Sequence, residues 1–116
     1  MAYVDGFVVP VPKDKRDAYL KVAREAAAIF REYGARRVVE CWGDDVPEGK
    51  LTSFPMAVKL EAGETAVFSW IEWPDRAARD EGMKKAMADK RLQPEGGMPF
   101  DGKRLIYGGF QMIVSA

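Results

Sequence analysis

The sequence lacks histidine altogether and has a single cysteine among its 116 residues. Without histidine there is no Ser-His-Asp or Cys-His nucleophile, no histidine-ligated zinc or haem, and no imidazole base that titrates near neutral pH. The one cysteine, Cys41, can form neither an intrachain disulfide nor a thiolate metal cluster. We therefore expect no metal and no cofactor, and we interpret Cys41 as a buried structural thiol.

Net charge is also missing, because 18 Lys and Arg residues balance 18 Asp and Glu residues. A balanced chain has no general electrostatic attraction to nucleic acid or to an anionic membrane surface. No apolar run approaches the ~20 residues of a membrane span, and the start of the chain does not have the pattern of a secretory leader. We expect no nucleic-acid or membrane partner, and a reducing, cytoplasmic setting.

What the chain does have is an ordinary globular composition, with 47% hydrophobic and 31% charged residues. Its length fits one domain, since typical domains hold about 100 to 150 residues. We therefore predict that residues 1–116 form a single domain.

The apolar pattern predicts four strands and two helices. We expect strands at residues 3–11, 36–44, 66–73 and 104–114, the first ending at the breaker Pro10-Val11-Pro12. We expect helices at 13–33, closed by Gly34, and from Asp75 as N-cap to about residue 90. Prolines and glycines interrupt residues 46–64, where 56–60 could be a short helix or a short strand. A connection of this length is often a functional lid.

The order βαββαβ predicts a ferredoxin-like α+β fold, with both helices on one face of an antiparallel sheet. The strands are apolar on both sides: Val8 lies opposite Phe7 and Val9, and Trp70 lies opposite Ile71. With no spare segment to cover the second face, we expect a homodimer packed sheet to sheet.

Several segments resemble the YbaA-like proteins, a bacterial family classed as a domain of unknown function. They are residues 3–7, 39–47, 53–55, 68–71 and 98–104, and the run Glu-Cys-Trp-Gly-Asp-Asp at 40–45 is the most specific. The resemblance implies a dimeric α/β barrel, in agreement with the homodimer expected from two-sided strands. It implies no particular activity. The wider superfamily includes cofactor-free monooxygenases and isomerases, an analogy of fold alone.

Three acidic residues inside strands, Asp5, Glu40 and Glu72, are the candidates for catalysis. Alternation places Glu40 beside Trp42 and Glu72 beside Trp70. If the two faces coincide, both carboxylates lie among tryptophans, where desolvation would raise their pKa values and suit one of them to proton transfer. The alternative is that each acid is paired structurally with a nearby lysine or arginine.

Aromatic side chains are the candidates for ligand binding. They could line an apolar pocket, with residues 54–56 as its lid, although core packing would explain most of them as well. Phe54 and Phe100 stand beside prolines in long loops, where an aromatic is more often a contact surface or lid. The full set is Trp42, Phe54, Trp70, Phe100 and Tyr107.

Three functions remain open on the sequence. The first is a small-molecule binding or accessory role through an apolar pocket. The second is a cofactor-free enzyme, of monooxygenase or isomerase type, that uses an in-strand carboxylate. The third is a protein-interaction module. A closed apolar pocket with a desolvated carboxylate favours the enzyme, a pocket without one favours binding, and the absence of a pocket favours interaction.

Overall fold

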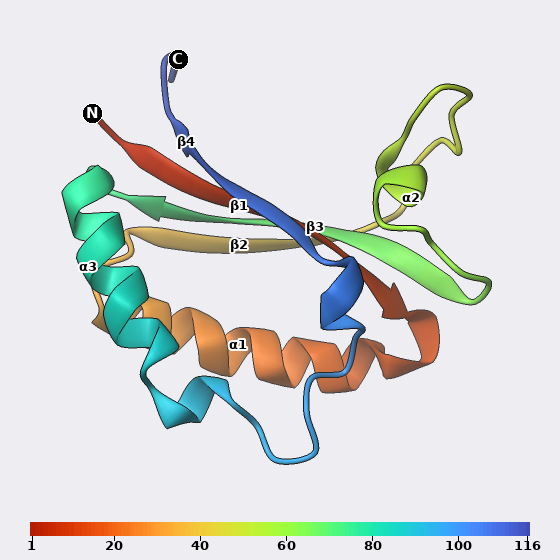
Figure 1. Ribbon diagram of the computed structural model, residues 1–116, viewed down its shortest axis with the longest axis horizontal. Coiled ribbons are helices and arrows are strands. Elements are labelled where there is room, and N and C mark those ends of the chain that lie inside the picture. Colours follow the sequence, from red (N-terminus) through yellow and green to blue (C-terminus); the bar gives the residue numbers. More distant parts are fainter.

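The computed structural model describes residues 1–116 as a four-stranded antiparallel sheet with two long helices on one side (Figure 1). The strands are β1 (Tyr3–Pro12), β2 (Arg37–Trp42), β3 (Glu64–Trp73) and β4 (Ile106–Gln111). The helices are α1 (Arg16–Glu32), the short α2 (Phe54–Ala57) and α3 (Arg76–Met87). The strand order β2-β3-β1-β4 confirms the predicted ferredoxin-like α+β fold.

Strand β1 runs through the prolines that were expected to end it. The backbone N–H of Lys13 donates to the carbonyl of Gly63 at 2.9 Å, so odd-numbered residues at this end of β1 direct their N–H groups toward β3. Pro10 and Pro12 therefore direct their nitrogens to the other edge, where pairing with β4 stops at Val8. Because no strand lies on that edge, the missing donors cost no hydrogen bond.

The helix boundaries follow the expected signals at two of four ends. Helix α1 begins at Arg16, after a 3-10 turn at Lys13–Lys15, rather than at residue 13. Gly34 adopts φ 105° directly after Tyr33, the C-cap of α1, as predicted for a helix C-terminus. The side chain of Asp75 accepts the N–H of Ala78 at 2.8 Å and caps α3. Helix α3 ends at Met87 rather than near residue 90, and a separate 3-10 turn follows at Lys90–Leu92.

Strand β4 is shorter than predicted at both ends. Residues Gly102–Arg104 form a 3-10 turn, and Gln111 is the last paired residue because its partner in β1 is Tyr3, where β1 begins. The apolar Ile113 and Val114 therefore have no strand to pair with, and each is 83% exposed.

Register divides the sheet into two faces. Asp5 pairs with Ile71 and Phe7 with Ser69, and these side chains lie on the side that α1 and α3 cover, here called the helix face (Figure 1). The opposite side is here called the open face, and its main apolar residues are Val4, Val8, Phe68, Trp70, Ile106 and Phe110. The molecule measures only 22 Å along its shortest axis, as expected for one sheet and one layer of helices.

The segment around α2 covers one end of the open face, which corrects the expectation that no segment could do so (Figure 1). Ser53 caps α2 by accepting the N–H of Met56, so the ambiguous region forms a short helix. Val58 is 1% exposed and packs against Val8 and Ala66. The rest of the face stays uncovered.

No helix in the structure has both the length and the apolar composition needed to cross a bilayer.

Candidate functional site

The candidate site is a cavity of about 240 Å³ between the helix face and α1, here called the inner cavity. Of its 17 lining residues, 15 are hydrophobic. Strands contribute Phe7 and Ile71, while the connection from α3 to β4 contributes Met98 and Phe100. This connection passes alongside α1 in Figure 1, where it is light blue, and its apolar side chains close part of the cavity wall.

The inner cavity exists because the middle of α1 presents small side chains to the sheet. Tyr19, Ala23, Ala26 and Phe30 follow the three- and four-residue spacing of one helical face, and all four line the cavity. The bulky Tyr19 and Phe30 lie at the two ends of this row of residues, and Ala23 and Ala26 lie between them. Since an alanine reaches only to Cβ, the space between helix and sheet stays unfilled there.

Glu40 is the one ionisable acid or base on the cavity wall apart from the tyrosine that contacts it. The hydroxyl of Tyr19 donates to Glu40 Oε1 at 2.6 Å. None of the ion pairs in the structure includes Glu40. The carboxylate thus has a neutral partner and no compensating cation, and Ser69 is the other polar residue of the wall.

The apolar surroundings raise the pKa of Glu40, because they disfavour its charged form more than the Tyr19 hydrogen bond favours it. Glu40 is nevertheless an exposed residue of the edge strand β2, so a ligand can reach it. Burial and the adjacent carboxylate raise the pKa of Tyr19 far above its ordinary range. Tyr19 therefore remains a neutral hydrogen-bond donor, and Glu40 is the group that can exchange a proton.

Asp5 lies outside the inner cavity and is paired structurally. It is 4% exposed, accepts the Trp73 indole N–H at 2.9 Å, and forms a salt bridge with Arg79 Nη2 at 2.9 Å. The guanidinium of Arg79 also lies over the ring of Tyr3, 5.1 Å from its centre. A Cβ atom at Gly109 would sit 2.5 Å from the Tyr3 hydroxyl oxygen and 2.6 Å from Arg79 Nη2, so any other residue there would displace part of this cluster.

Glu72 lies on the open face, and the predicted juxtaposition with Glu40 is wrong. Glu40 pairs with Ser69, whereas Glu72 pairs with Arg37, and this register puts the two carboxylates on opposite sides of the sheet. Glu72 accepts the Trp70 indole N–H at 2.9 Å and lies 3.8 Å from an Arg37 nitrogen. Alternation fixes the faces within each strand, but only the register between strands decides which faces coincide.

Two of the five candidate aromatics lie close to Glu40. Phe100 lines the inner cavity and packs against Tyr19 with 6.0 Å between ring centres. Trp42 packs against the same tyrosine at 6.4 Å. Trp70 also borders the cavity, but its ring packs on Phe68 of the open face at 5.6 Å.

The other two aromatics lie away from the cavity. Phe54 begins α2 and contacts Phe68 on the open face, so residues 54–56 do not form a lid over the inner cavity. The cover comes instead from Met98, Phe100 and Leu105. Tyr107 is 77% exposed on the edge strand β4, where it stacks on Phe7.

Tyr19 and the alanines of α1 were not among the predicted site residues. The available signal was the size pattern of the apolar face, in which Ala23, Ala26 and Ala27 interrupt larger residues. A run of alanines on the sheet-facing side of a helix indicates either close helix packing or an unfilled space. The structure shows the second.

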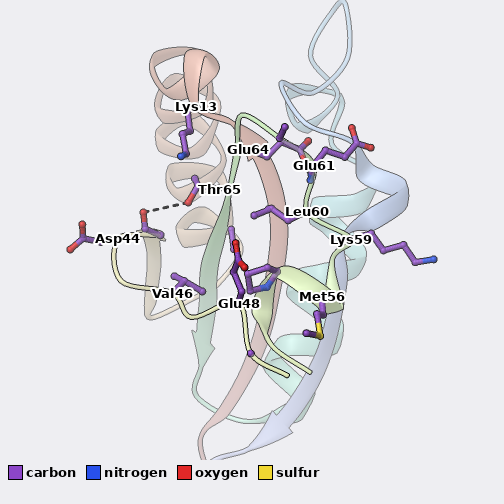
Figure 2. A pocket seen from close by; sticks show the side chains of 15 residues that line it. Lys13, Asp44, Val46, Glu48, Met56, Lys59, Leu60, Glu61, Glu64 and Thr65 are labelled. Atoms are coloured by element: carbon purple, nitrogen blue, oxygen red, sulfur yellow. Dashed lines mark hydrogen bonds between the residues drawn. The ribbon is translucent and has the colours of Figure 1, made fainter. Parts of the chain in front are cut away.

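A larger hollow of about 650 Å³ lies beside α2, and Figure 2 shows its wall. It carries charges of both signs, including Lys13, Asp44 and Glu48. Glu64 is engaged by Arg104, whose Nη1 lies 2.7 Å from Oε1. The charged groups therefore do not converge on one point, and no group of three metal-binding side chains occurs in the structure. The inner cavity is the better candidate site.

Comparison with solved structures supports the fold. The chain is similar to an uncharacterized NIPSNAP domain protein from Burkholderia xenovorans, with 17% identity, TM-score 0.56, and coverage of 98% of this chain and 97% of that one. It is also similar to Rv0793 from Mycobacterium tuberculosis, with 15% identity, TM-score 0.53, and coverage of 100% and 99%. At these identities the likeness shows the fold alone.

Comparison of sequences gives the family. The chain is 58% identical over 115 residues to the uncharacterized protein YbaA of Escherichia coli K12, covering 98% of each chain, and equally so to that of Shigella flexneri. The family model described as "Protein of unknown function (DUF1428)" matches residues 2–102. The resemblance to YbaA-like proteins is confirmed, and no specific function is established for them. The chain belongs to the DUF1428 family.

Proposed function

We propose that this protein binds a small, mostly apolar molecule in the inner cavity. The observation that carries the proposal is an apolar space of about 240 Å³ with one accessible carboxylate on its wall. Ligand sites are typically apolar concavities with a few polar groups that fix orientation. The volume lies below the range of about 300–1,000 Å³ usual for drug-sized ligands. The expected ligand is therefore smaller than a typical drug.

The position of the polar groups supports binding rather than a packing defect. An unfilled core space in a structural domain is expected to be lined by apolar atoms only, because a carboxylate there raises the cost of burial. Glu40 is exposed at this edge of the sheet, yet its carboxylate borders the apolar wall without a cation, and its raised pKa reflects a partial loss of water. A ligand that contacts Glu40 would both fill the space and satisfy the free carboxylate oxygen.

Filling the cavity tests this proposal. Hydrocinnamyl alcohol, an aromatic ring on a short chain with one hydroxyl, is a suitable probe for a titration followed by NMR. Ala26→Leu is expected to weaken its binding at least tenfold, about 1.4 kcal/mol, because the added side chain occupies the space beneath α1. The protein should remain at least as stable, since the substitution fills a void.

Ala28→Leu is the matched control, because Ala28 is exposed on the same helix and does not line the cavity. This variant should bind the probe as the wild type does. Equal binding by the wild type and Ala26→Leu would place the probe elsewhere and contradict the proposal. So would the absence of any binding at millimolar concentration.

The second candidate is a cofactor-free enzyme that transfers protons through Glu40, favoured by the raised pKa of this carboxylate. The Glu40 carboxylate would take a proton from a carbon next to a ketone. The C–H electron pair would become the enolate double bond, and the carbonyl oxygen would take the negative charge. Returning a proton to the same or another carbon would complete an exchange or an isomerisation, without oxidant or cofactor.

Loss of the α-hydrogens of benzylacetone in deuterated water measures this step. Glu40→Gln is expected to reduce the exchange to the buffer rate, a fall of about 10²- to 10⁴-fold if Glu40 is a general base. The rate should rise with pH through the pKa of Glu40, because only the carboxylate accepts a proton. Tyr19→Phe removes the hydrogen bond that lowers this pKa, so the profile should shift to higher pH. An unchanged rate in Glu40→Gln would contradict the mechanism.

We also propose that two chains pack open face to open face in a cytoplasmic homodimer. Support comes from the part of the open face that α2 leaves uncovered. Phe68 is 44% exposed, Ile106 43% and Phe110 59%, and they lie on neighbouring parts of one face. Contiguous apolar surface of this kind is characteristic of interaction sites.

A further inference from the structure

We propose that the ligand of the inner cavity is a small amine, with a hydrocarbon body and one ammonium group that pairs with Glu40. This inference rests on the proposed binding function and deepens it by assigning the chemical class of the ligand. It follows from the charges on the cavity wall, from the hydrogen bonds that Glu40 leaves open, and from the rings around it.

The charges on the wall exclude acidic ligands. Among the 17 lining residues there is one carboxylate, Glu40, and no lysine or arginine. The basic side chain near this end of α1, Arg16, lies over the ring of Trp42 at 5.5 Å and does not line the cavity. A ligand carboxylate or phosphate would meet the like charge of Glu40 without a cation to offset it.

The hydrogen bonds of Glu40 favour a donor on the ligand. Tyr19 donates its single hydroxyl hydrogen to Oε1, and no protein group donates to Oε2. A purely apolar ligand would remove water from Oε2 and supply nothing in return, which carries the cost of an unsatisfied buried charge. A ligand with an N–H or O–H group at this point restores the lost hydrogen bond.

An ammonium fits this position better than a hydroxyl does. Both an ammonium and a hydroxyl would donate a charge-assisted hydrogen bond to the carboxylate, but only the ammonium also brings a positive charge that offsets the charge of Glu40. The wall also presents the rings of Phe7, Phe30 and Phe100, which attract a cation when it approaches their faces. The ammonium has three hydrogens to donate, and besides Glu40 Oε2 the wall offers hydroxyl oxygens from Tyr19 and from Ser69, the residue that pairs with Glu40 across the sheet.

Three probes with the same body test the assignment: hydrocinnamylamine, hydrocinnamyl alcohol and hydrocinnamate. On the wild-type protein at neutral pH, the amine should bind about tenfold more tightly than the alcohol, and about 100-fold more tightly than the carboxylate. Glu40→Gln should remove the advantage of the amine, because the amide cannot supply the negative charge. Circular dichroism and thermal unfolding would check that this variant is folded.

Glu25→Gln is the matched control, since Glu25 is an exposed acid of α1 outside the inner cavity. It changes the net charge equally and should keep the preference for the amine. Equal affinity for amine and alcohol, or a preference that survives in Glu40→Gln, would overturn the assignment. In that case, weaker binding of hydrocinnamyl alcohol to Ala26→Leu than to the wild type would still support the binding function. If none of the three probes binds, the function and the ligand class both fail.

Discussion

Replacing Asp5 by alanine is expected to lower the free energy of unfolding by about 3 kcal/mol, the lower end of the range for breaking a buried ion pair. Asp5 is 4% exposed and accepts hydrogen bonds from Trp73 Nε1 and from two nitrogens of Arg79. Without it, the partly buried Arg79 guanidinium would keep only the exposed Asp80 as a counter-ion, and Trp73 would lose its acceptor. The lower end is expected because Arg79 keeps 23% side-chain exposure.

Chemical denaturation of Asp5→Ala and Asp80→Ala measures the effect. Asp80 is the matched control, because it contacts the same guanidinium at 2.9 Å but is 55% exposed. A surface pair of this kind is worth about 0–1 kcal/mol. Folded Asp5→Ala should still bind the cavity probe with wild-type affinity, since Asp5 does not line the inner cavity. Loss of affinity without loss of stability would show that Asp5 is a site residue after all.

The fold could be predicted because its signals are local. The apolar run of β1, the closing Gly34 and the capping Asp75 each act within a few residues, and the order of elements then leaves few topologies. The predicted ends of β1 and β4 were wrong because pairing with a neighbouring strand decides where each strand stops. Pro10 and Pro12 stay in β1 because its pairing with β4 stops at Val8, and Ile113 is unpaired because β1 begins at Tyr3.

The site was predicted less well than the fold because it depends on contacts between distant segments. Glu40 was identified as an in-strand acid, but its partner Tyr19 is 21 residues away on α1. The register of β2 on β3 separates Glu40 from Glu72, and no property of either strand alone reveals it. Asp5 was also a candidate for catalysis, but in the fold it pairs with Arg79, which lies 74 residues further along the chain.

Introducing charge on the open face is expected to dissociate the proposed homodimer. The double variant Ile106→Asp/Phe110→Asp should have the mass of one chain in light scattering at micromolar concentration, where the wild type should have twice that mass. Specific interfaces bury about 800 Å² on each partner, and their centres contain few charged residues. Two aspartates from each chain would be desolvated there without a cation nearby, at a cost of several kcal/mol.

Strand alternation supplies the control for this experiment. Tyr107 lies between the two substituted residues in sequence and is 77% exposed, more than either of them, but its side chain points to the helix side of the sheet, opposite Phe7. Tyr107→Asp should therefore leave the dimer intact, whereas a general effect of charge on β4 would dissociate it as well.

Because both substituted side chains are partly exposed, the double variant should unfold as cooperatively as the wild type. A wild type with the mass of one chain would contradict the dimer, and so would a double variant that keeps twice that mass. In either case, the apolar surface between α2 and β4 would need another explanation.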